Sequence, residues 1–308
     1  MAFVEPTEAV AEGDGGVTGK ELVYPALFTT AEAASKQAQR DFLRLVRAEY
    51  ALLFTAAVLS LNLSERVEYY VLYALVFIGT LLCLMHRTGR KPEQVWYKCR
   101  ALAESVKTST WRFVMRAEPF DGDAAEARTA FRASLRDTLE SNQHIGENLA
   151  GATSDGAQST ESMESIRAMR WEERRNYYLE HRVGEQSRWY TAKARSNADA
   201  AWWYRWISVA IYGLALALVI LRIAYPTVKL WPIAPLVVAA SGVLGWMQIR
   251  KFNELASVYT LTAHEIGIIQ GKIRDVDSQV EFSEFVNEAE LAFSREHTQW
   301  TARQTGRY

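Results

Sequence analysis

The chain has 308 residues, of which 49% are hydrophobic and 23% charged, with 35 basic against 36 acidic side chains. These values exclude a disordered or collagen-like chain, and two cysteines imply no disulfide framework. A formal net charge of -1 provides no overall field for binding nucleic acid, so no nucleic-acid partner is expected.

The chain opens with residues 1–29, which are acidic and glycine-rich and are expected to form a flexible tail. This stretch has neither a basic start nor an apolar segment, so it does not have the features of a signal peptide. A helix is predicted from about residue 30, and it runs without a helix breaker into the first of several uncharged runs.

Four uncharged runs follow in two close pairs, at residues 50–64, 69–85, 206–221 and 230–249. A membrane-spanning helix needs roughly 17 to 25 apolar residues, so three of the runs are marginal by length. However, they are apolar on all faces and have aromatic residues near their ends, as lipid-facing helices do. We therefore predict four transmembrane helices in two hairpins, at about 48–65, 68–86, 203–223 and 230–249. An unusually apolar soluble core is the alternative.

Basic residues lie on one side of the predicted hairpins. They precede the first and third runs and follow the second and fourth, whereas the short connections contain only Arg66, Arg222 and Lys229. Because positively charged flanks stay in the cytoplasm, both termini and the central segment are expected there.

A plan of helix, hairpin and helix occurs twice along the chain. The predicted units are a first two-transmembrane domain at 30–120, a connecting helix and linker at 121–165, a second two-transmembrane domain at 166–290 and a C-terminal tail at 291–308. The predicted fold class is all-α, with four transmembrane helices continued by long cytoplasmic helices.

Two helical stripes combine aromatic and charged side chains at spacings of three and four residues, which place each set on one helix face. Such stripes can pack against each other across halves or subunits, or bind an anionic ligand or a lipid headgroup. Ordinary ion pairs on a solvated helix are the simplest alternative. The candidate residues are Trp96, Arg100, Glu104, Lys107 and Trp111 after the second run, and Arg182, Gln186, Trp189 and Lys193 before the third.

The uncharged runs contain a few polar residues and no ionisable carboxylate or base, which argues against an ion-coupled transporter. A pore lined by hydroxyl groups would be weakly selective, and one lined by apolar faces closes by dewetting. Equally, hydroxyl groups in such helices often bond only to the preceding turn. The candidate pore-lining or packing residues are Thr55, Ser60, Asn62, Thr80, Ser208 and Ser241.

Enzyme chemistry finds little support in the sequence. The five histidines are scattered, and there is no HExxH, CxxC, nucleophile-elbow, GxGxxG or Walker motif. We therefore expect no catalytic, cofactor-binding or metal-binding residues and predict that the protein is not an enzyme.

Two segments resemble the SLATT domains, the SMODS and SLOG-associating two-transmembrane effector domains. Residues 96–120, WYKCRALAESVKTSTWRFVMRAEPF, are similar to the motif that follows the hairpin in one class. Residues 177–194, YYLEHRVGEQSRWYTAKA, are similar to the approach to the hairpin in a second class, which often follows the first in tandem.

This resemblance implies an oligomeric effector that perforates the bacterial inner membrane in antiviral or abortive-infection defence. The implied partners are the lipid bilayer, further copies of the chain, and a nucleotide second messenger or partner sensor protein as trigger. The alternatives are a non-conducting membrane scaffold that assembles partners through its cytoplasmic helices, and a constitutive channel or transporter.

Overall fold

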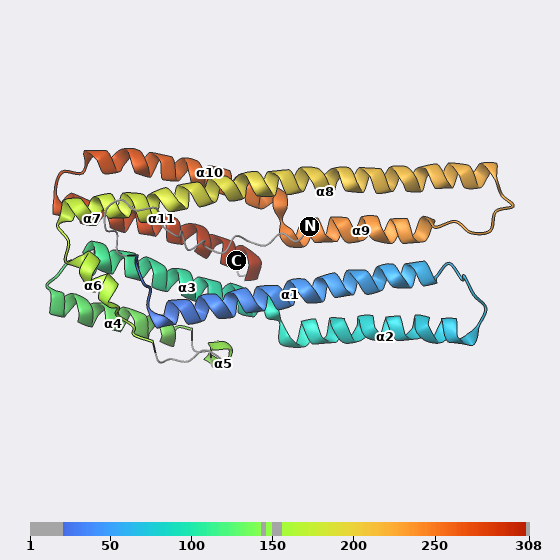
Figure 1. Ribbon diagram of the computed structural model, residues 1–308, viewed down its shortest axis with the longest axis horizontal. Helices are drawn as coiled ribbons and strands as arrows, with labels where there is room; N and C mark the ends of the chain where they lie inside the picture. The colour runs from blue at the N-terminus through green and yellow to red at the C-terminus, as the bar shows by residue number, and fades with distance from the viewer. Residues whose placement is uncertain (1–20, 143–145, 150–155, 306–308) are drawn as a thin grey trace.

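The computed structural model describes residues 21–142, 146–149 and 156–305. In this part of the chain all regular elements are helices, as the sequence predicts. Figure 1 shows an elongated bundle in which two helical hairpins, α1–α2 and α8–α9, project from one end and the remaining helices gather at the other. The hairpins touch through α1 and α9.

The first half of the chain forms α1 (Ala26–Leu59), α2 (Val67–Arg90) and α3 (Pro92–Met115). Helix α1 extends without a break from the bundle into the first hairpin, and α2 returns alongside it (Figure 1). A single left-handed residue, Lys91 with φ 44°, ends α2 and precedes α3. Proline at the first position of α3 suits this joint because the first N–H of a helix has no intrahelical acceptor.

Three shorter helices connect the halves: α4 (Ala124–Glu140), α5 (Gly146–Leu149) and α6 (Glu161–Arg167). Helix α4 is capped by Asp123, whose carboxylate accepts hydrogen bonds from the backbone N–H groups of Ala125 and Glu126 at 2.8 and 2.9 Å. These bonds to the charged form lower the pKa of Asp123. Part of the predicted linker, residues 150–155, lies outside the described residues.

The second half forms α7 (Trp171–Tyr178), a π-helical segment η2 (Leu179–Gly184) and α8 (Glu185–Ala224), followed by α9 (Ile233–Arg250) and α10 (Phe252–Lys272). Lys251, with φ 49°, joins α9 to α10 as Lys91 joins α2 to α3. After a 3₁₀ turn, η3 (Ile273–Asp275), the chain ends its described part with α11 (Gln279–Thr305). Most of the predicted C-terminal tail is therefore helical.

The main hydrophobic core lies at the end of the bundle away from the hairpins and joins α3, α4, α6, α7 and α11. It includes Leu22 and Phe28, which belong to the predicted amino-terminal tail. Their burial ties residues 21–29 to the bundle, while residues 1–20 of that tail lie outside the described part of the chain.

Arg167 is a buried charged residue beside this core. Its guanidinium donates to the carbonyl groups of Phe113, Phe120 and Gly122. Its burial lowers its pKa to about 10.

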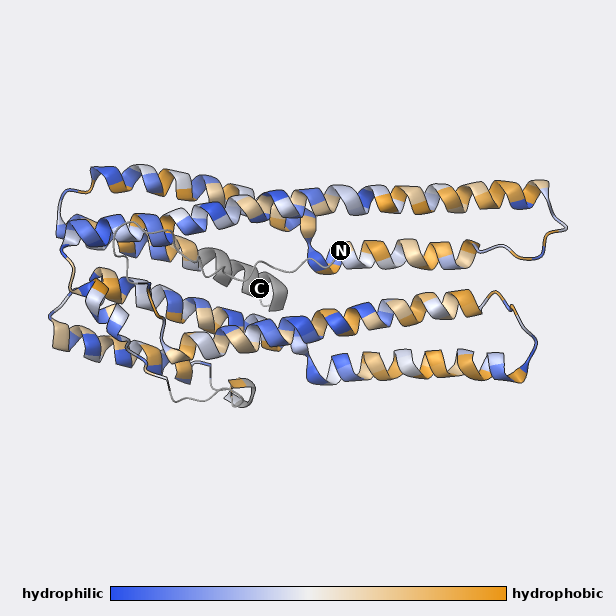
Figure 2. Cartoon of the chain, viewed as in Figure 1, coloured by the Kyte–Doolittle hydropathy of each residue, from blue (hydrophilic) through white to orange (hydrophobic). Residues whose placement is uncertain are grey.

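Three continuous helical stretches are long and apolar enough to cross a membrane: Val67–Met115, Trp171–Ala224 and Ile233–Asp275. Their apolar parts lie in the hairpins (Figure 2), and only 6% to 11% of the residues in these parts are buried. The predicted span at 48–65 does not meet the same criterion. Helix α1 ends at Leu59, so the predicted segment consists of an apolar helix end and the following turn. The structure thus supports three of the four predicted spans, and the fourth stays a prediction.

Candidate functional site

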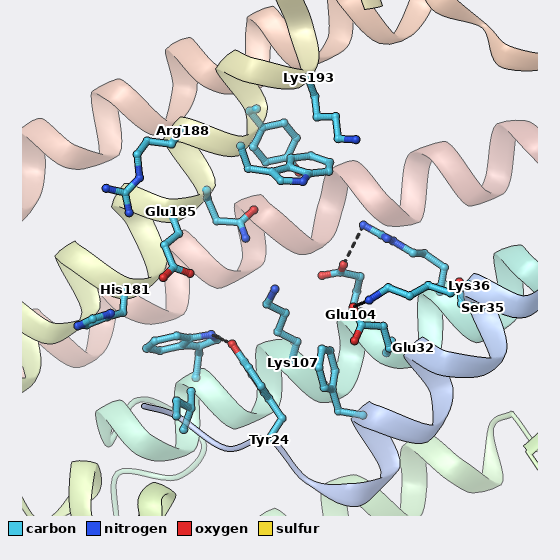
Figure 3. Close-up of a pocket in the computed structure, with 18 of the residues that line it drawn as sticks. Tyr24, Glu32, Ser35, Lys36, Glu104, Lys107, His181, Glu185, Arg188 and Lys193 are labelled. Atoms are coloured by element: carbon cyan, nitrogen blue, oxygen red, sulfur yellow. Dashed lines mark hydrogen bonds and ion pairs between the residues drawn. The ribbon is translucent and has the colours of Figure 1, made fainter. Parts of the chain in front are cut away.

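A cavity of about 680 Å³ lies between α1, α3 and the η2–α8 segment, in the part of the bundle outside the hairpins. Figure 3 shows charged and aromatic side chains converging on it from these elements. The cavity brings together the whole first stripe and most of the second, which the sequence places more than 70 residues apart. The stripe residues in its wall are Trp96, Arg100, Glu104, Lys107, Trp111, Gln186, Trp189 and Lys193.

One wall of the cavity is aromatic and joins α3 to the segment that precedes α1. The indole N–H of Trp111 donates to the Tyr24 hydroxyl at 2.9 Å, and the Trp111 side chain is buried. The ammonium of Lys107 lies 5.8 Å from the centre of the Tyr24 ring and 6.0 Å from that of Phe28. These are cation–π distances, so Lys107 is held over a preformed aromatic surface (Figure 3).

The wall formed by α1 and α3 carries two ion pairs within single helices. Lys36 pairs with Glu32 at 2.9 Å, and Arg100 pairs with Glu104 at 3.3 Å. Both have i to i+4 spacing and are partly exposed, so each contributes only a few tenths of a kcal/mol. Arg100 thus makes the local ion pair that the solvated-helix alternative predicts, although it does so on the wall of a cavity.

The opposite wall comes from α8. The ammonium of Lys193 lies 5.8 Å from the centre of the Trp189 ring, and Trp189 in turn contacts the Tyr259 ring of α10 at 5.5 Å between centres. Tyr190 is buried behind them. The packing against α10 fixes these rings, so the α8 wall presents a supported aromatic and cationic surface toward α3.

Arg182, the first member of the second stripe, does not line the cavity. Its guanidinium donates to both carboxylate oxygens of Glu290 in α11, at 2.7 and 2.8 Å, and the Tyr178 hydroxyl donates to the same carboxylate at 2.9 Å. Burial by itself lowers the pKa of Arg182. The nearby Glu290 carboxylate acts in the opposite direction through its charge and its hydrogen bonds, and the pKa of Arg182 lies above its ordinary value. Glu290 is not among the residues predicted from the sequence. The feature of the sequence that could have revealed Glu290 is its position as a single carboxylate on a helix face otherwise formed by apolar residues. These residues are Phe282, Val286, Ala289 and Phe293.

The polar residues of the predicted spans do not meet at one place. Four hydroxyl groups donate to the carbonyl four residues earlier in their own helix, and Ser60 donates to the carbonyl of Ala57. Asn62 adopts a left-handed conformation in the turn between α1 and α2. This is the arrangement in which hydroxyl groups satisfy their own helices, and it provides no shared polar lining. The four hydroxyl groups that donate to the carbonyl four residues earlier belong to Thr55, Thr80, Ser208 and Ser241.

The two hairpins approach each other closely at Gly245 of α9. A Cβ atom at this position would collide with the hydroxyl group of Tyr50 in α1. Beside this contact, the Arg47 guanidinium lies 5.1 Å from the centre of the Trp246 ring. Tryptophan and arginine at the charged ends of apolar helices are typical of a membrane interface. Among the described residues, no group of three or more His, Cys, Asp or Glu side chains is placed to hold a metal ion.

Comparison with family models gives two matches in tandem. Residues 25–175 match SMODS and SLOG-associating 2TM effector domain 3, and residues 178–300 match SMODS and SLOG-associating 2TM effector domain 1. Neither the curated proteins nor the solved structures give a match. The boundary falls within α7, so the α1 and α3 walls of the cavity belong to the first matched region and the α8 wall belongs to the second.

Proposed function

Because the chain belongs to the SLATT effector domains and carries two of them in tandem, we propose that it is an oligomeric pore-forming effector of bacterial antiviral or abortive-infection defence. In this proposal it is a multi-pass protein of the inner membrane with both termini in the cytoplasm. A nucleotide signal or a partner sensor protein triggers it.

The observation that carries this proposal is the outward exposure of the apolar hairpins. Large apolar side chains such as Leu81 of α2 and Leu216 of α8 are more than half exposed, although they lie in the most apolar parts of the chain. Exposed apolar surface of this extent requires lipid or further protein to cover it. Lipid covers it in a single copy, and neighbouring copies cover part of it in an oligomer.

The satisfied hydroxyl groups support a resting state that does not conduct. Thr80, Ser208 and Ser241 each bond within their own helix, so a single chain presents apolar faces rather than a polar channel. A pore lined by such faces closes by dewetting and opens only when the helices move apart. Oligomerisation or a change in hairpin orientation is therefore the step that we assign to the trigger.

In this proposal the trigger acts on the part of the bundle outside the hairpins, where the cavity lies. Helices α1 and α8 each run continuously from the cavity wall into a hairpin (Figure 1). A rigid helix transmits a displacement along its length. A change at the cavity or at the surface of the bundle is thereby coupled to the membrane.

Release of a trapped dye from liposomes tests pore formation. The purified full chain is reconstituted with and without a panel of cyclic nucleotides, and triggered dye release is the expected result. Leu81→Asp should abolish release because a carboxylate in the apolar part of α2 costs several kcal/mol (~2.5–3.5) on insertion. Leu81→Met preserves the apolar surface and serves as the matched control. If no condition releases dye, the pore assignment is wrong.

The satisfied hydroxyl groups also favour the non-conducting scaffold. Membrane potential in expressing cells separates the two functions, since a scaffold leaves the potential unchanged on triggering and a pore collapses it. A constitutive channel or transporter would instead produce flux without growth arrest.

A further inference from the structure

We propose that the cavity between α3 and α8 binds a small ligand that consists of a planar ring with an attached anionic group, and that the bound ligand links the two SLATT domains. This proposal concerns binding and does not depend on whether the protein forms a pore. It follows from the size, lining and position of the cavity.

The size and the lining suit a planar ring. Sites for small molecules in proteins have volumes of roughly 300 to 1,000 Å³, and this cavity of about 680 Å³ lies within that range. Trp96 and Trp189 line it from opposite walls, and Tyr24 and Phe28 line it near the start of α1. Aromatic walls favour a ring because flat π surfaces stack with little loss of conformational entropy.

The charges in the lining favour an anionic group on that ring. Five Lys and Arg side chains and four Glu side chains line the cavity. Two of the carboxylates, Glu32 and Glu104, form the ion pairs on the α1 and α3 wall. The other cations of the lining, Lys107, Arg188 and Lys193, outnumber its other carboxylates, Glu21 and Glu185.

The cation–π contacts argue against a cationic ligand. The ammonium group of Lys107 lies 5.8 and 6.0 Å from the ring centres of Tyr24 and Phe28, and that of Lys193 lies 5.8 Å from the ring centre of Trp189. A ligand cation in the cavity would be repelled by these ammonium groups. An anion instead meets ammonium groups that the protein already holds in place, which reduces the entropy lost on binding.

The position of the cavity gives binding a structural consequence. Lys107 lies on α3 in the first SLATT domain, and Lys193 lies on α8 in the second. They project into the same cavity from opposite walls (Figure 3). A ligand that contacts both therefore stabilises one arrangement of the two domains and of the helices that lead into the hairpins.

Calorimetric titration of the full chain in detergent tests the ligand class. The probes are AMP and indole-3-acetate, which represent a nucleotide and an aromatic carboxylate, with adenosine as a ring without an anion and inorganic phosphate as an anion without a ring. Binding of either ring-bearing anion, about tenfold or more tighter than adenosine and phosphate, is expected. The probe that binds identifies the source. If neither binds, or if adenosine binds as tightly as AMP, the proposal is wrong.

Three lysine variants test the site itself. Lys107→Met and Lys193→Met should each weaken binding about tenfold, whereas Lys272→Met, on the exposed surface of α10 outside the cavity, should leave it unchanged. Equal losses in all three variants would place the ligand elsewhere. Hydrogen exchange then tests the link between domains, because a bridging ligand protects the backbone around Lys107 and around Lys193 together. Protection of only one of them would contradict bridging.

Discussion

The guanidinium of Arg182 and the carboxylate of Glu290 form a bidentate ion pair inside the bundle, with side-chain exposures of 3% and 0%. Arg182 lies in η2, just before the helix that enters the second hairpin, and Glu290 lies in α11. The Arg182 guanidinium also lies 5.2 Å from the centre of the Phe293 ring. The pair therefore fixes α11 to the start of the second domain's long helix.

Glu290→Gln should destabilise the bundle strongly. The substitution leaves the Arg182 guanidinium buried without a counter-charge, and breaking a buried pair in this way costs about 3 to 5 kcal/mol. Denaturant unfolding of the detergent-solubilised chain, followed by tryptophan fluorescence, measures the loss. The control is Glu288→Gln on the same helix, whose partner Lys272 lies 4.0 Å away at the surface. It should cost less than about 1 kcal/mol. Equal effects of the two substitutions would contradict the importance of the buried pair.

Because the phenol of Tyr177 is buried, we expect the protein to lose stability at alkaline pH. Burial raises the pKa of this phenol to about 12 from an ordinary value of 10. The folded state therefore favours the neutral phenol, and the resulting stability is fully present below pH 10 and lost as the pH rises toward 12. Tyr177→Phe should reduce the fall in melting temperature between pH 10 and 12. Tyr225→Phe, in the exposed turn after α8, should leave that fall unchanged. An unchanged slope for Tyr177→Phe would refute the prediction.

Gly245→Ala should weaken the contact between the hairpins. The new methyl group would collide with the Tyr50 hydroxyl, and overpacking of this kind costs about 1 to 3 kcal/mol. Gly242→Ala on the same helix is the matched control because a Cβ atom there meets nothing within 4 Å. That control should gain up to about 1 kcal/mol from the better helix propensity of alanine. Melting temperatures in detergent measure both effects, and the same sign for the two variants would disprove the close approach.

Cysteine labelling tests the topology. In a Cys83→Ala, Cys99→Ala background, Thr227→Cys lies in the turn between α8 and α9 and Asp277→Cys lies between η3 and α11. A membrane-impermeant maleimide added to intact cells should label the first variant and should label the second only after lysis. The reverse pattern would invert the predicted orientation.

The hairpins could be predicted because their helices are apolar on every face, and this feature is visible in the order of residues. The predicted span at 48–65 has the weakest support, since it lies on α1, which carries charged residues before its apolar end and stops at Leu59. Contacts between distant segments leave weaker signals. Glu290 and its helix face are one example, because nothing in the sequence pairs them with Arg182.

The stripes were predictable as faces, because spacings of three and four residues align side chains on a helix. Packing across the two halves was one of the alternatives for these stripes, but the sequence could not select it, since the outcome depends on how two separate helices pack. Arg182 shows a further limit. The π-helical segment η2 changes the number of residues per turn, so Arg182 points into the core while Gln186, four residues later, lines the cavity.

The left-handed residues Lys91 and Lys251 give the two domains the same mechanical design. In each domain one long helix, α1 or α8, runs without a break from the bundle into a hairpin. The other part of each domain is two helices joined at one left-handed lysine, α2 with α3 or α9 with α10. A lysine with positive φ carries backbone strain that a helical φ would relieve. Each joint is therefore held in place by the packing of the helices on either side of it. The two helices of each hairpin are therefore joined to the bundle in different ways, one by a continuous helix and the other through a single strained residue.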